Sequence, residues 1–219
     1  MTRFIANSEV TRARIQQFYG RDASVIHPPV DVDRFRLGQV EDFFLVVGEL
    51  VPHKRIEVAL EAARRAGRPI KVVGGGPDLR RLSRQYGAGA EFLGRVSDTA
   101  LVDLYARARA LIVPGVEEFG ITAVEAQASG RPVIAAGEGG ARETVLDGET
   151  GVLVPPDAVD GFAEAIRETN FDSFNPERLR THATGFSRET FKRRLRAEVE
   201  RLTRPSGPYQ AVPPAGVHR

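Results

Sequence analysis

The chain has 219 residues, of which 42% are hydrophobic and 27% charged, a composition typical of a globular protein long enough for one sizeable core or two small ones, and one main domain is the first expectation. It contains no Cys, which excludes disulfides, cysteine-ligated zinc and a thiol nucleophile and is typical of a reducing compartment, so we expect a cytoplasmic protein. The formal net charge of +2 is too balanced to indicate a nucleic-acid partner.

The first 38 residues differ in pattern from the rest of the chain. FIANS at 4–8 is typical of a short strand and residues 9–19 of a helix. VIHPPVDVDRF at 25–35 contains two adjacent prolines, which favour a stiff, extended connector. We therefore expect residues 1–38 to be the remnant of a preceding N-terminal domain together with its connector.

From residue 42 onward, short apolar runs alternate with amphipathic segments. The runs predict six strands, at 43–48, 70–74, 90–94, 110–114, 132–136 and 151–155. The segments between and after them predict helices, near 54–66, 77–86, 98–108, 120–129, 140–146, 157–169 and 176–184. Six strands joined by helical crossovers predict an α/β fold, a Rossmann-like doubly wound parallel sheet covered on both faces, over residues 39–185.

The C-terminal part combines a basic helix with a Pro-rich tail. SRETFKRRLRAEVERLTR at 187–204 predicts a helix over 188–203, which could lie on an anionic membrane surface, dock on another domain or face solvent. Residues 205–219 contain four Pro and two Gly without periodicity, and we expect a disordered tail. No apolar run approaches the ~18 residues of a membrane-spanning helix.

Glycines and charged residues follow the predicted strands. In a doubly wound sheet, ligands bind outside the carboxyl ends of the strands, so these segments are where a site is expected. The segments are ELVPHKR (49–55), GGGPD (74–78), RVSD (95–98), GVEEFG (115–120) and GEGGARE (137–143).

The stretch PGVEEFGITAVEAQASGRPVIA at 114–135 reads as a strand end, a loop and a helix that starts near Gly120. A helix N-terminus attracts phosphate, and Gly120 would let a diphosphate approach the backbone. Glu125 would lie roughly 7–8 Å into the helix, at ~1.5 Å per residue, while Glu117 stays in the loop. The two carboxylates could bind hydroxyls on either side of a nucleotide-sugar diphosphate. Equally, Glu117 and Glu118 could favour the helix dipole with Glu125 exposed, and spacing alone leaves both interpretations open.

EEFGITAVEAQASGRPVIA resembles the Glu-x7-Glu signature of retaining glycosyltransferases with the GT-B fold, the glycosyl transferases of group 1. The resemblance covers nearly all of residues 4–204 and is strongest to bacterial mannosyltransferases that use GDP-mannose. It continues through VGELVPHKRIEVALEA (47–62), VVGGGPDLRRL (72–82), FLGRVSD (92–98) and GGARETVLDGETGVLVPP (139–156). It implies the C-terminal, donor-binding half of a GT-B fold, in an enzyme that transfers mannose from GDP-mannose to a glycan or lipid-linked acceptor.

The resemblance also implies roles for individual residues. Glu117 would contact the donor sugar and Glu125 the ribose. Lys54 would neutralise the diphosphate and so ease its departure, although a solvated helix position is the simpler alternative. Arg55 would assist Lys54 or face solvent. The backbone amides that would bind the diphosphate belong to Phe119, Gly120, Ile121 and Thr122.

Two further positions concern the base of the nucleotide. The backbone of Val96 matches a position that contacts the base in the family. Asp98 could pair with a guanine edge, or it could be the N-cap of the following helix, and both remain open. The GGGP turn at 74–77 needs glycine for packing alone.

The sequence departs from the family at Glu49, where the family usually has a second diphosphate-binding Arg. A carboxylate there cannot pair with phosphate, and Arg55 and Arg142 are the nearest substitutes. The four His residues have no metal-ligand spacing and the family needs no metal for donor binding. We therefore expect no metal site and no cofactor besides the donor.

A GT-B enzyme has two Rossmann-like domains, and the sequence predicts one of them. FIANS resembles the last strand of the N-terminal, acceptor-binding domain, which we expect as a partner in cis or in trans. The helix within 186–204 would normally cross back onto that domain. The chain alone would then be inactive in transfer. Alternatives are a stand-alone nucleotide or nucleotide-sugar binding module and, less favoured, half of a GT-B-like epimerase or phosphorylase.

Overall fold

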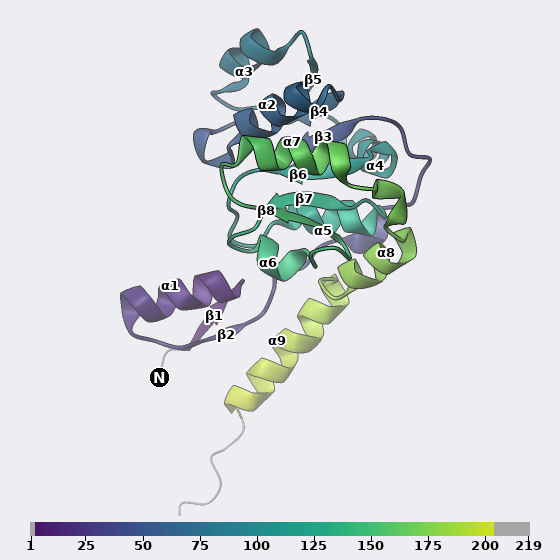
Figure 1. Ribbon diagram of the computed structural model, residues 1–219. Coiled ribbons are helices and arrows are strands. Elements are labelled where there is room, and N and C mark those ends of the chain that lie inside the picture. The colour runs from purple at the N-terminus through teal and green to yellow at the C-terminus, as the bar shows by residue number, and fades with distance from the viewer. Residues whose placement is uncertain (1–2, 204–219) are drawn as a thin grey trace, which may run out of the picture.

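Helices cover both faces of a six-stranded parallel sheet in the computed structural model, which describes residues 3–203 (Figure 1). The strands are β3 (Phe44–Val47), β4 (Ile70–Val73), β5 (Ala90–Gly94), β6 (Ala110–Val113), β7 (Val133–Ala136) and β8 (Gly151–Val154). Their order is β5-β4-β3-β6-β7-β8, and every neighbouring pair is parallel. The predicted doubly wound α/β fold is confirmed. The predicted tail at 205–219 lies outside the described residues.

The helices between the strands also follow the prediction. They are α2 (Ile56–Ala66), α3 (Leu79–Tyr86), α4 (Asp98–Arg107), α5 (Ile121–Ala128), α6 (Ala141–Thr144), α7 (Val159–Glu168) and α8 (Pro176–Thr184). Asn175 is the N-cap of helix α8, and its side chain accepts from the amides of Glu177 and Arg178. An Asn at this position satisfies first-turn N–H groups, which is why the helix starts there.

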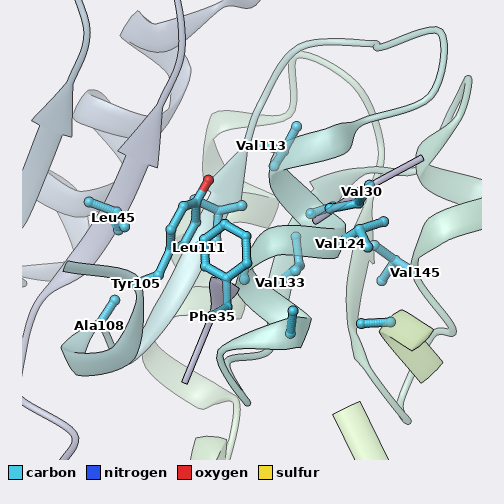
Figure 2. Close-up of a cluster of buried hydrophobic side chains, with 14 of the residues drawn as sticks. Val30, Phe35, Leu45, Tyr105, Ala108, Leu111, Val113, Val124, Val133 and Val145 are labelled. Atoms are coloured by element: carbon cyan, nitrogen blue, oxygen red, sulfur yellow. The ribbon is translucent and has the colours of Figure 1, made fainter. Parts of the chain in front are cut away.

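Two apolar cores lie on opposite faces of the sheet. Consecutive strand residues point to opposite faces, so Leu45 packs with Tyr105 and Val124 in one core (Figure 2), whereas Phe44 packs with Leu60 in the other. Strands buried on both faces need apolar side chains at nearly every position, which is why the strands are short apolar runs. Full burial of one large apolar side chain, such as Leu or Phe, contributes about 1.5–3 kcal/mol to the stability of the fold.

The N-terminal segment forms a separate two-stranded parallel sheet. Strand β1 (Phe4–Ala6) pairs with β2 (Ala23–Val25), and α1 (Glu9–Tyr19) connects them. The FIANS strand is therefore present and paired within the chain. Figure 1 shows this unit beside the main body, joined to it by the connector. Whether it is the remnant of a larger domain stays a prediction.

Helix α9 (Arg188–Thr203) begins at the predicted residue and extends away from the sheet (Figure 1). It also contacts the N-terminal unit, where Ser24 Oγ donates to Glu198 Oε1 at 2.5 Å. Across residues 3–203, every helix is too short or too polar to span a bilayer.

Candidate functional site

The loops after β3 and β6 meet at the carboxyl edge of the sheet, where the strand order reverses. The two strands are neighbours although β4 and β5 come between them in the sequence. Crevices at such reversals are the usual ligand sites of doubly wound sheets. The loops touch at Gly115, where a Cβ atom would lie 2.9 Å from the carbonyl oxygens of His53 and Lys54. Glycine is thus needed at this position for the two loops to approach each other.

Lys54 and Glu117 form an ion pair between these two loops. Lys54 ends a short 3₁₀ helix, Pro52–Lys54, and its Nζ donates to the two carboxylate oxygens of Glu117 at 2.7 and 2.6 Å. The side chains are 28% and 18% exposed, so water screens the pair only in part. Two of the predicted site residues, 63 positions apart in the sequence, therefore lie side by side.

The turn that precedes α5 presents the backbone of the next predicted residues. Gly120 has φ 89° and ψ 60°, a left-handed conformation that favours glycine. Helix α5 follows directly with Ile121 and Thr122, and within residues 3–203 no side chain caps its N-terminus. The amide of Ala123 donates to the carbonyl of Gly120 at 3.1 Å, so the N–H groups of Ile121 and Thr122 and the positive end of the helix dipole are available to an anion.

The adjacent carboxylates of Glu117 and Glu118 point to different partners. Glu118 accepts from Arg14 Nη1 of α1 at 3.2 Å. Its own backbone N–H and this guanidinium lower the pKa of the Glu118 carboxyl. The loop thus directs Glu117 to Lys54 and Glu118 to the N-terminal unit, so the two acidic residues are not equivalent.

Phe119 anchors the same turn by its side chain. The ring is 4% exposed and lies 5.4 Å from the ring of His27 and 5.5 Å from that of Phe186, centroid to centroid. The amide of Gly140 donates to the carbonyl of Glu117 at 2.7 Å and fixes the loop from the other side. The sequence indicated no role for His27. Its stacking on Phe119 could not be inferred, because the two residues lie far apart in the chain.

Glu125 lies about one turn into α5 and is held by Tyr105 of α4. The Tyr105 hydroxyl donates to Glu125 Oε2 at 2.9 Å. Burial raises the pKa of the Glu125 carboxyl, and the charge of Asp98 adds to this increase. The hydrogen bond from Tyr105 and the charge of Arg34 act in the opposite direction and lower the pKa in part. Tyr105 is fully buried, and burial together with Glu125 raises its own pKa well above the usual value. The sequence indicates no role for Tyr105, because its place in a helical pattern carries no sign of the hydroxyl's partner.

A pocket of about 510 Å³ lies at the ends of β3, β4 and β5. Val96 lines it, as do Gly75 and Arg95. Arg95 follows β5 directly, so its position at the carboxyl edge was the signal that could have identified it. The pocket is lined by Val47, Gly48, Glu49, Val73, Gly74, Gly75, Arg95, Val96 and Leu101.

Asp98 does not line this pocket. Its side chain is 85% exposed, and its carboxylate accepts from Arg34 Nη1 at 3.3 Å. The alternative that Asp98 is a helix N-cap is wrong. Ser97 holds that position, and its hydroxyl accepts from the amide of Ala100 at 3.2 Å. Serine takes this role because its Oγ reaches the first-turn amide from an extended backbone.

Metal-ligating residues do not gather in the described part of the chain. Over residues 3–203 the structure contains no group of three or more His, Cys, Asp or Glu side chains that could hold a metal ion. The candidate site is therefore described by its cations, carboxylates and backbone amides.

The family model described as Glycosyl transferases group 1 matches residues 31–185, which include the Lys54–Glu117 pair, the α5 turn and the pocket. The chain belongs to this family. D-inositol 3-phosphate glycosyltransferase 2 of Catenulispora acidiphila is 34% identical, and the match covers 75% of this chain and 47% of that protein. D-inositol 3-phosphate glycosyltransferase of Mycobacterium tuberculosis is 35% identical, over 75% of this chain and 40% of that protein. The chain thus spans less than half the length of these curated relatives.

Solved glycosyltransferase structures share the fold of this group 1 glycosyltransferase domain. AviGT4, a glycosyltransferase involved in avilamycin A biosynthesis, matches with a TM-score of 0.76 and 27% identity, over 90% of this chain and 63% of that chain. HepE of Anabaena, in complex with UDP, matches with a TM-score of 0.79 and 23% identity over the same shares. These matches agree with the predicted GT-B class of fold.

The cations proposed to replace the family's second Arg are engaged elsewhere. Arg55 Nε donates to Asp157 Oδ1 at 2.6 Å, which raises the pKa of Arg55 and turns it toward the loop before α7. Arg142 Nε donates to the carbonyl of Gly137 at 2.7 Å. Glu49 itself is exposed and lines the pocket next to Arg95. Arg95 is thus the cation that shares a pocket with Glu49.

Proposed function

We propose that this chain is the donor-binding domain of a retaining glycosyltransferase that transfers a hexose from a nucleotide sugar to an acceptor. The observation that carries the proposal is the Lys54–Glu117 pair beside the uncapped N-terminus of α5. A cation and free helix amides suit a diphosphate, and a carboxylate at the same point suits sugar hydroxyls.

Each group would act on a different part of the donor. The amides of the turn from Phe119 to Thr122 would hold the diphosphate, and Lys54 would stabilise the charge that develops on it as it leaves. Glu117 would bind the sugar and Glu125, oriented by Tyr105, would bind the ribose. The pocket lined by Val96 would receive the base, and no step requires a metal or another cofactor.

For the donor we propose GDP-mannose, on the resemblance of the motifs to GDP-mannose-dependent mannosyltransferases. Asp98 is exposed and does not line the pocket, so its proposed pairing with a guanine edge no longer supports GDP. The preferred base is therefore to be determined by binding measurements. Calorimetric titration with GDP, UDP, ADP, GDP-mannose and UDP-glucose is the test. We expect GDP and GDP-mannose to bind at least tenfold more tightly than the others, or about 1.4 kcal/mol. A preference for UDP would refute the base, and no saturable binding at millimolar concentration would refute the function.

For the acceptor side we propose an N-terminal domain, in cis or in trans, that binds a glycan or lipid-linked acceptor. Transfer needs an aligned acceptor and exclusion of water, which a second domain across the crevice would provide. The names of the curated relatives make an inositol phosphate a second acceptor candidate. Sugar transfer by the 219-residue chain with no partner would refute this division of roles.

A stand-alone binding module without transfer is the alternative, and Glu49 is the observation that favours it. A carboxylate in the donor pocket opposes diphosphate binding and would weaken support for the leaving group. Retaining transfer in the presence of the N-terminal domain of a relative would exclude this alternative.

We also propose a cytoplasmic location with peripheral membrane contact through α9, whose exposed side chains include Arg193, Arg194 and Arg196. Co-sedimentation with vesicles is the test. We expect binding to vesicles with anionic lipid and none to purely zwitterionic ones, with loss of binding at high salt. Equal binding to both would contradict an electrostatic contact.

A further inference from the structure

A second pocket lies at the opposite edge of the sheet from the donor site. It is formed where the chain enters β6 and β7, because Arg109 precedes the first of these strands and Arg131 and Pro132 precede the second. Its volume is about 160 Å³. A cavity of ~150 Å³ can hold a guest of the size of benzene, so there is room for a small ion or the head of a small molecule. The lining comprises Val40, Arg109, Gly130, Arg131, Pro132, Phe171, Asp172, Phe174 and Pro176.

Arg131 is the buried cation of this pocket. It is 5% exposed, and its Nη2 donates to the carbonyl of Gly38 at 2.8 Å. Its Nε is buried and has no hydrogen-bond partner, and no carboxylate pairs with the guanidinium, within residues 3–203. Burial without a counter-charge lowers the pKa of Arg131. A buried charge of this kind is costly unless something pairs with it.

Arg109 adds a second guanidinium to the same lining. Its side chain is 25% exposed, and its partners are Asp42 at 3.3 Å and Asp172 at 3.7 Å. Its Nε, the atom nearest Asp42, is buried and makes no hydrogen bond among the described residues. Asp172 is 83% exposed, so its charge is largely screened by water. Asp42 lies outside the lining and also pairs with Arg68, so within the lining the two guanidiniums face one screened carboxylate.

We propose that this pocket binds a small oxyanion, a phosphate or carboxylate group, between Arg131 and Arg109. The planar guanidinium presents parallel N–H groups that match two oxygens of such a group. A water molecule would satisfy Nε of Arg131 but would leave its charge unpaired. The apolar lining, with Phe171, Phe174 and Pro176, would accommodate an organic part of the ligand. Since the pocket lies at the amino edge of the sheet, it can be filled while a donor occupies the carboxyl edge.

The test is a titration of the whole chain, labelled with 15N in its Arg residues, with inorganic phosphate, phenyl phosphate and benzoate. Ionic strength is kept constant with chloride. We expect a saturable shift of the Nε–H resonance of Arg131, assigned by its loss in Arg131→Gln, and a rise in Tm, because the ligand binds only the folded state. Stronger binding of phenyl phosphate or benzoate would identify an organic anion, whereas binding of phosphate alone would identify the free ion.

Variants separate this pocket from the donor site, whose α5 turn also suits phosphate. Lys54→Met should leave the Arg131 shift unchanged. Arg131→Lys keeps the positive charge but loses the parallel N–H groups of the guanidinium, and should weaken binding at least tenfold. Asp172→Asn removes the negative charge at the pocket and should tighten binding several-fold. Arg80→Gln, an exposed charge change outside the pocket, serves as the matched control. An Arg131 resonance that does not move with any of the three anions, or that moves equally in chloride, would overturn the proposal.

Discussion

Nζ of Lys54 lies 2.6 Å from Oε2 of Glu117, so the cation proposed to receive a diphosphate is already paired with the carboxylate proposed to receive the sugar. A bound diphosphate must share the ammonium with Glu117 or displace it. The pair is partly buried, so this competition is stronger than it would be between two exposed side chains. Occupancy of the donor site is thereby coupled to the position of the sugar-binding carboxylate.

The first prediction is that Glu117→Gln separates nucleotide binding from sugar recognition. The neutral amide no longer competes for Lys54, so bare GDP should bind at least as tightly as to the parent, while the added affinity of GDP-mannose over GDP is lost. Lys54→Met should weaken both ligands about 10–150-fold, the loss of a charge-assisted hydrogen bond of roughly 1.5–3 kcal/mol. Calorimetry measures the binding of GDP and of GDP-mannose to each variant, and Lys192→Met on α9 is the control. An unchanged preference for GDP-mannose in Glu117→Gln would contradict the assigned role.

The second prediction concerns Glu143, which joins three parts of the chain. Its carboxylate lies 2.8 Å from Nε2 of His27 and accepts from the amide of Glu9, at the start of α1, at 3.0 and 3.1 Å. Glu143→Ala removes an anion from the N-terminus of α1. It also removes the polar partner of His27, whose ring stacks on Phe119. We expect faster hydrogen exchange in the first turn of α1 and weaker GDP binding.

The control for Glu143 is Glu138→Ala, which removes an exposed carboxylate from the loop that precedes α6. Glu143→Gln retains one acceptor oxygen for the Glu9 amide and should give an intermediate exchange rate. If Glu143→Ala leaves exchange in α1 unchanged, the contact does not hold the N-terminal unit in solution.

The sequence predicted the strands and helices because apolar periodicity follows directly from burial on two faces of a parallel sheet. It also predicted that the segments holding Lys54 and Glu117 would lie at the same ligand-binding edge, since both follow strands that end there, but it did not predict their ion pair. It did not predict the Tyr105–Glu125 hydrogen bond or the contact of His27 with Glu143, 116 residues away. Those contacts depend on side-chain direction and on helix placement, which periodicity does not specify.

The third prediction is a pH dependence of stability at Glu125. Burial raises the pKa of Glu125 in the folded chain. The contribution of Glu125 to the free energy of unfolding is therefore fully present below the pKa of ~4.3 that a Glu has in the unfolded chain, and it is lost as pH rises through the folded pKa. Glu125→Gln removes this loss while the amide oxygen can still accept from Tyr105. The variant should match the parent near pH ~4 and become more stable toward neutral pH, by ~2–4 °C in Tm for each 1 kcal/mol.

Thermal unfolding across this pH range measures the difference. Glu164→Gln, which neutralises an exposed carboxylate on α7, should show no such trend. A stability difference that is constant with pH would mean that Glu125 is not desolvated in the folded chain.

The last prediction concerns Glu49, where the resemblance to the family predicts a second diphosphate-binding Arg. Glu49 is exposed and lines the same pocket as Arg95, so this position can be altered without disturbing the core. Glu49→Arg should tighten GDP binding about tenfold by adding a cation near the diphosphate, and Glu49→Gln should tighten it less, by removing only the repulsion. Guanosine, which has no phosphate, should bind both variants as it binds the parent. If instead guanosine binding falls in both variants while GDP gains nothing, Glu49 contacts the base and not the phosphates, and the carboxylate is a specificity determinant in place of the missing cation.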